Sequence, residues 1–312
     1  MKEVCFVGSE TEIRCVDIND GTTTFSIEDA STILETVPDR KGTNPFLVSA
    51  QENRKTLSLF DHRHKLKTKT FPTQISALAA STKYIVVGFE EGFFSVVSKK
   101  DGRTVLSHDG HVGAITRLGF STDEKALVSC GHDGAVCLWD VSVFPSENTG
   151  DICLSKWREH TMPVSDMHVG IGVADRFRLI TSSHDNTCCL LSPAAENPIG
   201  RIRFETPIAS VTMDSLERII AAGSTCGKIY LQSTENRKEL NGTLSGHTDA
   251  VSAVSFSIDN TQLLSVSLDC TLSVWSLLSR ERVCVVRLGS PAHSLHAAIY
   301  RRGSHSRNPP AI

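Results

Sequence analysis

The side chains of this chain that are suited to chemistry form a set of His, Ser, Asp and Trp that occurs twice at one spacing. One copy is His247, Ser265, Asp269 and Trp275, and Ser, His and Asp are the residue types of many hydrolytic active sites. The other copy comprises His111, Ser129, Asp133 and Trp139. In both copies the Asp follows the His by 22 residues and the Ser by 4, and the Trp follows the Asp by 6. Because an active site has no reason to recur at a fixed spacing, we interpret the set as a structural relay from indole N–H to hydroxyl to neutral imidazole to carboxylate.

Short strands must position each copy of this relay. Between Gly246 and Trp275, apolar runs at 251–256, 263–266 and 272–275 are each about one strand long, and turn-like residues separate them. A Gly-His pair opens this unit, and the matching unit at 110–140 closes with Trp-Asp. Self-similar units of this length resemble the WD repeat, whose four-stranded blades close into a propeller.

Weaker copies of the unit fill the rest of the chain. A fifth copy opens with His160, offers Thr181 and Asp185 as relay partners, and has Leu191 where the other copies have Trp. The last apolar strand, 293–300, has no unit of its own, and the first unit lacks an innermost strand. The sequence therefore predicts an all-β, seven-bladed WD40 β-propeller over residues 1–300, with its first blade closed by the C-terminal strand. Residues 301–312 are predicted to be a basic, Pro-containing flexible tail.

The overall composition is that of a soluble globular protein. Apolar residues make up 40% of the chain and charged residues 21%, and the net charge of −3 gives no global electrostatic case for nucleic acid. The ten cysteines contain no CxxC pair and mostly fall in apolar strands, which indicates a reducing compartment without disulfides. We expect no signal peptide and no membrane span. The composition is typical of a cytosolic or nuclear protein.

The remaining His–Asp and Cys pairs do not predict a metal or cofactor site. His132 and His184 each directly precede a turn Asp, but the two pairs recur at the repeat period and belong to different blades. Cys188 and Cys189 are adjacent in a strand, so their side chains point to opposite faces and cannot chelate one ion. The chain has no Gly-rich phosphate loop and no Gly-x-Ser-x-Gly elbow. We therefore expect no catalytic residue, no metal and no cofactor, and predict that the protein is not an enzyme.

One basic stretch allows two interpretations. Lys65, Lys67 and Lys69 alternate along a predicted outermost strand, which places them on one face of it. Lysines in this position protect an edge strand against aggregation. The alternative is a direct, salt-sensitive contact with RNA phosphates. Only three Trp and three Tyr are present in the chain to stack on bases, which favours the first interpretation.

Beginning at the fourth and fifth blades, the sequence resembles one particular family of WD-repeat proteins. The segment WREHTMPVSDMHVGIG (157–172), the relay unit at 246–275 and the closing HAAIY (296–300) are similar to one family. That family is the WD-repeat subunit of the complex that processes the second internal transcribed spacer and remodels the large ribosomal subunit precursor. The resemblance covers about residues 75–300. The weak first three blades and Leu191 depart from the WD consensus.

The resemblance implies a non-catalytic scaffold in pre-rRNA processing and maturation of the large ribosomal subunit precursor. Its implied partners are a large helical-repeat scaffold protein rich in Pro, Glu and Leu and other subunits of the same complex. The precursor particle and a midasin-type AAA+ ATPase would be reached indirectly. The implied location is the nucleus, in nucleolus and nucleoplasm, with the cytoplasm as a second site. Family members continue into a C-terminal helix that supports self-association, and Pro309-Pro310 cannot form such a helix.

Candidate protein-binding residues lie in the irregular loops, because loops vary without disturbing the strands. An insertion at 141–151 is predicted between the third and outermost strands of the fourth blade. Ordinary solvated loop, or blade packing for Trp157, is the alternative for each candidate. A generic WD-repeat adaptor, such as a ubiquitin-ligase substrate receptor or a chromatin scaffold, is the alternative function. The candidates are Phe144, Asn148, Trp157, Arg158, His132, His184 and Leu268.

Overall fold

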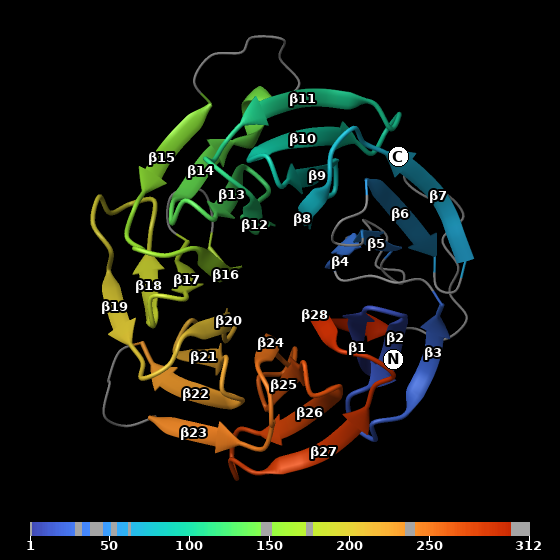
Figure 1. Cartoon of the computed structure of the whole chain (residues 1–312), viewed down its shortest axis with the longest axis vertical. Helices are drawn as coiled ribbons and strands as arrows, with labels where there is room; N and C mark the ends of the chain where they lie inside the picture. Colours follow the sequence, from blue (N-terminus) through green and yellow to red (C-terminus); the bar gives the residue numbers. More distant parts are fainter. Residues whose placement is uncertain are drawn as a thin grey trace.

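The computed structural model describes residues 2–28, 33–37, 46–50, 55–61, 64–144, 152–172, 177–234 and 241–300. The described residues form 28 strands, β1–β28, and one short 3-10 helix, η1 (Val141–Val143). The strands make seven antiparallel four-stranded sheets, which stand as blades around a central axis (Figure 1). The prediction of an all-β, seven-bladed propeller closed by the C-terminal strand is confirmed.

The blades are numbered along the chain, and their strands run from the axis outward. Blade 1 consists of β28 (Ala292–Tyr300), β1 (Lys2–Ser9), β2 (Ile13–Asp17) and β3 (Thr23–Ile27). Blade 2 consists of β4 (Ile33–Val37), β5 (Phe46–Ala50), β6 (Thr56–Asp61) and β7 (His64–Thr70). Blade 3 consists of β8 (Ile75–Ala80), β9 (Tyr84–Phe89), β10 (Phe93–Ser98) and β11 (Thr104–Asp109). Blade 4 consists of β12 (Ile115–Phe120), β13 (Ala126–Gly131), β14 (Val136–Asp140) and β15 (Cys153–Trp157).

The last three blades follow the same plan. Blade 5 consists of β16 (Val164–Val169), β17 (Leu179–Ser183), β18 (Thr187–Leu191) and β19 (Gly200–Arg203). Blade 6 consists of β20 (Ile208–Met213), β21 (Ile219–Ser224), β22 (Lys228–Ser233) and β23 (Gly242–Ser245). Blade 7 consists of β24 (Val251–Phe256), β25 (Gln262–Ser267), β26 (Thr271–Ser276) and β27 (Arg282–Arg287).

The ring is closed by pairing between the two ends of the chain. β28 runs antiparallel to β1 along its whole length, with Lys2 opposite Tyr300 and Ser9 opposite Ala292. β28 is the innermost strand of blade 1 and packs beside β24 of blade 7 and β4 of blade 2. Every blade therefore has a neighbour on both sides, and the ring has no open end.

The hydrophobic core is divided among the contacts between neighbouring blades. Seven buried clusters each combine side chains from two adjacent blades and together follow the ring round. Because each sheet is covered on both faces, a second strand such as β13 is buried at all six positions. An outermost strand such as β27 alternates exposed and half-buried positions instead. The period of the apolar pattern thus reports how far a strand lies from the axis.

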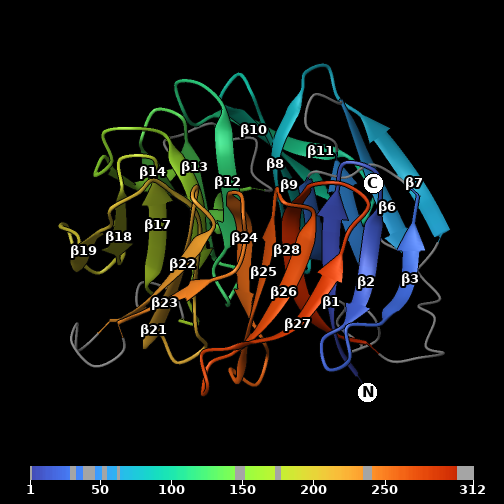
Figure 2. The same cartoon turned by 60° about the horizontal axis from the view of Figure 1, so that its bottom comes forward.

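Two faces of the disc are distinguished by their turns (Figure 2). The described turns that join the second and third strands of a blade lie on one face, which we call the relay face. The turns that join the first and second strands lie on the other, which we call the N-terminal face because β1 begins there. η1, which directly follows β14, also lies on the N-terminal face.

Candidate functional site

The relay of blade 7 joins the connection before β24 to strands β25 and β26. Trp275 Nε1–H donates to Ser265 Oγ at 2.8 Å, and Ser265 Oγ lies 2.8 Å from His247 Nε2. On the other side of the ring, His247 Nδ1 lies 3.0 Å from Asp269 Oδ2. The same carboxylate accepts hydrogen bonds from the backbone N–H of Thr248 at 3.0 Å and from Thr271 Oγ1 at 2.6 Å. The four relay residues therefore form one continuous chain of hydrogen bonds, from Trp275 through Ser265 and His247 to Asp269.

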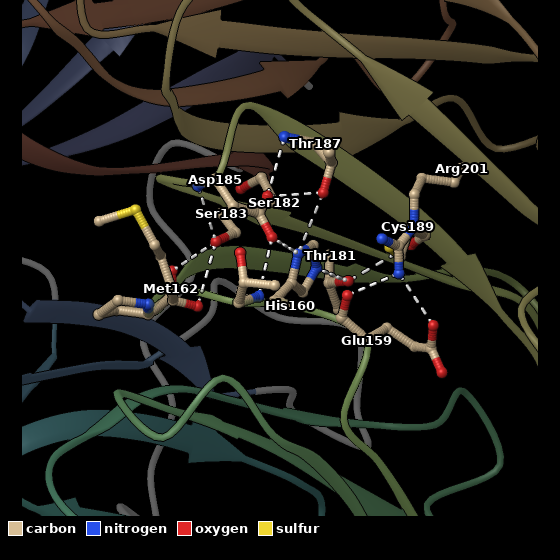
Figure 3. A network of polar contacts seen from close by, with 12 residues as sticks. Glu159, His160, Met162, Thr181, Ser182, Ser183, Asp185, Thr187, Cys189 and Arg201 are labelled. Carbon is tan, nitrogen blue, oxygen red and sulfur yellow. Dashed lines mark hydrogen bonds and ion pairs between the residues drawn. The ribbon is translucent and has the colours of Figure 1, made fainter.

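Blades 4 and 5 repeat this geometry. In blade 4, His111 lies 2.8 Å from Asp133 and 2.7 Å from Ser129, whose Oγ accepts the indole N–H of Trp139 at 2.8 Å. In blade 5, His160 Nε2 lies 2.9 Å from Thr181 Oγ1 (Figure 3). Its Nδ1 lies 3.1 Å from the carboxylate of Asp185. Blade 5 has Leu191 in place of Trp, so its relay begins at the threonine hydroxyl.

Local backbone geometry explains why the relay aspartate stands at a turn. The residue that follows it adopts a left-handed conformation, with φ of 70° at Gly134, 66° at Asn186 and 61° at Cys270. Gly and Asn adopt this conformation at low cost. The turn aims the carboxylate at the histidine and at the next backbone N–H groups, as in Ala135 N–H to Asp133 at 3.2 Å.

Burial fixes the protonation state of each relay. Burial lowers the pKa of His111, His160 and His247, although the paired carboxylates raise it. Burial raises the pKa of Asp269, but the hydrogen bonds from Thr271, Thr248 and His247 outweigh it, so its pKa is lowered. The relay therefore holds a neutral imidazole beside a carboxylate.

This arrangement does not present a nucleophile to solvent. Ser129, Ser265 and Thr181 are 0% exposed, and the hydroxyls of both serines already bind an indole and an imidazole. The groups that resemble a hydrolytic triad in sequence are thus turned into the blade. Their chemistry is to cross-link strands.

Polar side chains that the sequence reasoning missed lie on the inner strands, around the axis. Arg117 on β12 donates through Nε to Asp166 on β16 at 2.7 Å. On the other side of the axis, His296 Nε2 lies 2.7 Å from the carbonyl oxygen of Leu34, and its Nδ1 lies 3.9 Å from Glu35. Burial raises the pKa of Glu35, whereas Asp166 raises the pKa of Arg117. The only sequence signal for these residues was the charge within short apolar runs such as VSDMHV.

Three candidate binding residues gather around one cavity. His132, His184 and Leu268 line a cavity of about 850 Å³ where the axis opens on the relay face. Ser76 Oγ and Thr116 Oγ1 also border it, and neither has a hydrogen-bond partner among the described residues. No group of three or more His, Cys, Asp or Glu side chains in the described part of the chain is placed to hold a metal ion.

The other candidates are distributed differently. Phe144 is 0% exposed and packs edge-on against Tyr84, with ring centroids 5.8 Å apart. Trp157 is 5% exposed and belongs to the core between blades 4 and 5. Both side chains are buried in the propeller, Trp157 as the blade-packing alternative describes, and their contact with a partner stays a prediction. Arg158 is exposed, and Asn148 lies outside the described residues.

Two of the three lysines of β7, Lys65 and Lys69, contact the propeller itself. Lys69 Nζ donates to the carbonyl oxygen of Gly102 in blade 3 at 2.6 Å and lies 5.7 Å from the ring centroid of Phe71. Lys65 Nζ lies 5.8 Å from the centroid of Phe60. β7 is the outermost strand of its blade, the position at which lysines protect an edge.

The adjacent cysteines of blade 5 point to opposite sides of their sheet. Cys188 and Cys189 are both 0% exposed, and they belong to the cores on opposite sides of blade 5. All ten cysteines are free thiols. In the described residues no helix is long and apolar enough to cross a membrane.

The comparison with protein-family models decides which repeat this is. A model described as "WD domain, G-beta repeat" matches residues 102–140 and 238–276, the segments that contain the two complete relays. These two segments of the chain are WD repeats. Three relatives of this WD-repeat propeller show how far the similarity extends. This chain is 26% identical over 264 residues to "WD repeat-containing protein 18" of Rattus norvegicus, and the match covers 79% of this chain and 61% of the relative.

Two fungal relatives carry names that describe a process. The chain is 28% identical over 261 residues to "Pre-rRNA-processing protein IPI3" of Yarrowia lipolytica, covering 76% of this chain and 61% of the relative. It is 24% identical over 238 residues to "Pre-rRNA-processing protein crb3/ipi3" of Schizosaccharomyces pombe, covering 72% of this chain and 52% of the relative. The WD-repeat propeller thus spans less than two thirds of the length of these relatives.

Proposed function

We propose that this WD-repeat propeller is a non-catalytic scaffold in pre-rRNA processing, acting on the second internal transcribed spacer and in maturation of the large ribosomal subunit precursor. The observation that carries the proposal is the similarity, over 76% and 72% of the chain, to two fungal proteins named for pre-rRNA processing. The WD-repeat units at 102–140 and 238–276 support the scaffold part of it.

The geometry is consistent with a scaffold rather than an enzyme. The hydroxyl, imidazole and carboxylate groups that recur at the repeat spacing are consumed in buried hydrogen bonds between strands. Packing on both sides makes each blade a fixed platform, so loops on either face can differ while the disc stays rigid. Binding through loop side chains is the activity that such a disc supports.

The partners follow from the same proposal. They are a large helical-repeat scaffold protein rich in Pro, Glu and Leu and other subunits of one complex, with the precursor particle and a midasin-type AAA+ ATPase reached through them. The protein then works in the nucleus, in nucleolus and nucleoplasm. His132, His184 and Leu268 around the relay-face cavity, with exposed Arg158, are the candidate contacts. A direct RNA contact through Lys65 and Lys67 is a weaker candidate, because β7 is an edge strand.

Affinity purification of the tagged chain from its own cells tests this proposal. Recovery of the helical-repeat partner together with precursor large subunits is expected, as is accumulation of rRNA precursors that retain the second internal transcribed spacer after depletion. Recovery of a cullin adaptor or of chromatin proteins instead would favour the generic adaptor function and overturn the proposal. A matched strain expressing an unrelated tagged propeller controls for non-specific capture.

A further inference from the structure

Three consecutive blades each carry an exposed aliphatic side chain on the N-terminal face. Ile171 in the β16–β17 turn is 61% exposed, Leu216 in the β20–β21 turn is 59% exposed, and Ile258 in the β24–β25 turn is 50% exposed. Blades 5, 6 and 7 are neighbours in the ring (Figure 1). The three turns therefore follow one another along this face, and we call their exposed side chains Ile171, Leu216 and Ile258 the apolar arc. Ile171 lies within the VGIG motif that the sequence singled out.

The turns that hold the apolar arc are tied to one another on both sides of Leu216. Ser215 N–H donates to Asn260 Oδ1 at 3.2 Å, and the Asn260 amide also binds Ser215 Oγ, which joins blade 6 to blade 7. Glu217 forms an ion pair with Arg178 of blade 5, with Nε and Oε2 3.8 Å apart, and is hydrogen-bonded by the backbone of Ile171. The arc is held in place before any partner arrives, which reduces the entropy cost of binding.

The fold itself does not require aliphatic residues at these positions. The turns of blades 4, 6 and 7 share one conformation, with φ of 56° at Glu124, 55° at Glu217 and 56° at Asn260. In blade 4 the exposed positions of this turn are Thr122 and Lys125. Blades 3 and 4 are nevertheless linked in the same manner, by Thr82 N–H donating to Glu124 Oε1 at 2.7 Å. The same face thus has a polar sector and an apolar sector built on one architecture.

The turns beneath the apolar arc have few backbone donors to offer. Asp214 Oδ1 accepts the backbone N–H of Arg218 at 2.6 Å and of Ile219 at 2.7 Å. Asp259 Oδ1 accepts the backbone N–H of Thr261 at 3.0 Å. An extended segment would bring unpaired backbone groups to a surface that cannot satisfy them, whereas a helix satisfies its own. The surface therefore favours a helical partner.

Charge beside the apolar arc further defines the partner. Arg218 is exposed next to Leu216 and forms no ion pair within the part of the chain that the structure covers. Glu217, the nearest carboxylate in sequence, is already paired with Arg178. A partner with a carboxylate at this point is complementary.

We propose that the apolar arc is the docking surface for an amphipathic helix of another protein, whose aliphatic stripe lies on Ile171, Leu216 and Ile258 and whose carboxylate pairs with Arg218. The surface lies on the face opposite the relay-face cavity. The inference does not depend on the ribosomal role proposed above, because it rests only on the geometry and charge of the turns.

Synthetic helices provide the probe. Three peptides of about 18 residues share one leucine stripe and carry Glu, Gln or Lys at the positions that flank it. Titrated into the full chain and followed by calorimetry, the Glu peptide is expected to bind saturably and more tightly than the Lys peptide. The NMR resonances of the isoleucine δ1-methyl groups show where the peptide binds. We expect the resonances of Ile171 and Ile258 to shift. The resonance of Ile199, which is 49% exposed outside the arc, should not shift.

Three variants with unchanged melting temperatures complete the test. Leu216→Ser lowers the affinity for the Glu peptide by about tenfold or more, as expected for a central apolar contact. Arg218→Glu reverses the preference from the Glu peptide to the Lys peptide. Val112→Ser, which removes an 82% exposed side chain on the relay face, leaves binding unchanged. The proposal is overturned if no peptide binds saturably, if Val112→Ser has the same effect as Leu216→Ser, if Arg218→Glu leaves the preference unaltered, or if the arc instead mediates self-association.

Discussion

Asp166 binds Arg117 across the boundary between blades 4 and 5, with Oδ1 and Nε 2.7 Å apart. The other oxygen of the same carboxylate accepts the backbone N–H of Val211 in blade 6 at 2.9 Å. One side chain thus connects the inner strands of three consecutive blades. It does so beside the axis, where the first strands of all blades approach one another.

Replacing Asp166 should weaken the propeller from this inner ring. Asp166→Ala leaves the Arg117 charge unpaired and the Val211 N–H without an acceptor, so we expect a loss of about 2 to 4 kcal/mol in the free energy of unfolding. Asp166→Asn retains an acceptor for Val211 and should cost less. Denaturant unfolding measures both, with Asp109→Ala at an exposed position as the control. Equal stability of Asp166→Ala and the wild type would contradict the assignment.

Asp269→Ala should destabilise blade 7 by about 1 to 3 kcal/mol, because His247, Thr271 and the Thr248 N–H all lose their acceptor. Thermal denaturation checks this, against Asp249→Ala at an exposed neighbouring position.

A double-mutant cycle of Ser265→Ala with Trp275→Phe should show a coupling energy of about 0.5 kcal/mol or more, since these residues are in direct contact. Additive effects would mean that the relay does not act as a unit.

Stability should fall as the pH is lowered from 7 to 5. Burial lowers the pKa of His111, His160 and His247 in the folded protein, whereas in the unfolded chain a histidine has a pKa of about 6.5. Below about pH 6.5 the unfolded chain therefore binds more protons than the folded one, and acid favours unfolding. The lowered pKa values of Asp133, Asp185 and Asp269 extend the loss to pH below about 4.

Urea unfolding at a series of pH values measures this dependence. His247→Gln removes one of the titrating groups and should make the pH dependence shallower. A free energy of unfolding that stays constant or rises between pH 7 and pH 5 would show that the relay imidazoles are not neutral in the folded state.

Removing the closing strand should abolish cooperative folding. A chain that lacks residues 292–312 loses β28, which exposes the whole edge of β1 and one side of the cores on either side of blade 1. We expect loss of the single thermal transition and association through the open edge. A chain that lacks only 301–312 is the control, and we expect it to melt as the full chain does. A cooperative transition in the shorter chain would mean that the pairing of β28 with β1 is not needed to hold the ring.

The residues of blades 4 and 7 show why so much of the fold is readable from sequence. Each relay connects residues of one blade, so its members lie within 28 positions of one another and their spacing repeats whenever the blade repeats. Leu191 was recognised as a departure from the pattern because the positions around it kept the spacing. Drifted blades still alternate strand-length apolar runs with turns, because every blade must fill the same space between its neighbours.

Contacts between blades were outside the reach of that reasoning. Arg117 and Asp166 are 49 residues apart on different blades, and no spacing within a repeat indicates how far one blade is staggered against the next. Phe144 was expected to be a loop residue because it lies in the insertion predicted at 141–151, between the third and outermost strands of blade 4. η1 instead turns it inward onto Tyr84, a residue of the preceding blade. The apolar arc escaped notice for the same reason, since its three residues are neighbours only in the assembled ring.

The pairing of β1 with β28 has a consequence for synthesis of the chain. β1 is the first strand to be made and β28 the last, and their partners in register begin at Lys2 and end at Tyr300. At about 5 to 20 residues per second, the β1 edge waits roughly 15 to 60 s for its partner while the other six blades are translated. The blades can form in order as they emerge, but the ring can close only when residues 292–300 have been made. During that interval the nascent propeller presents an unpaired edge, and a chaperone that shields strand edges would act on it at this step.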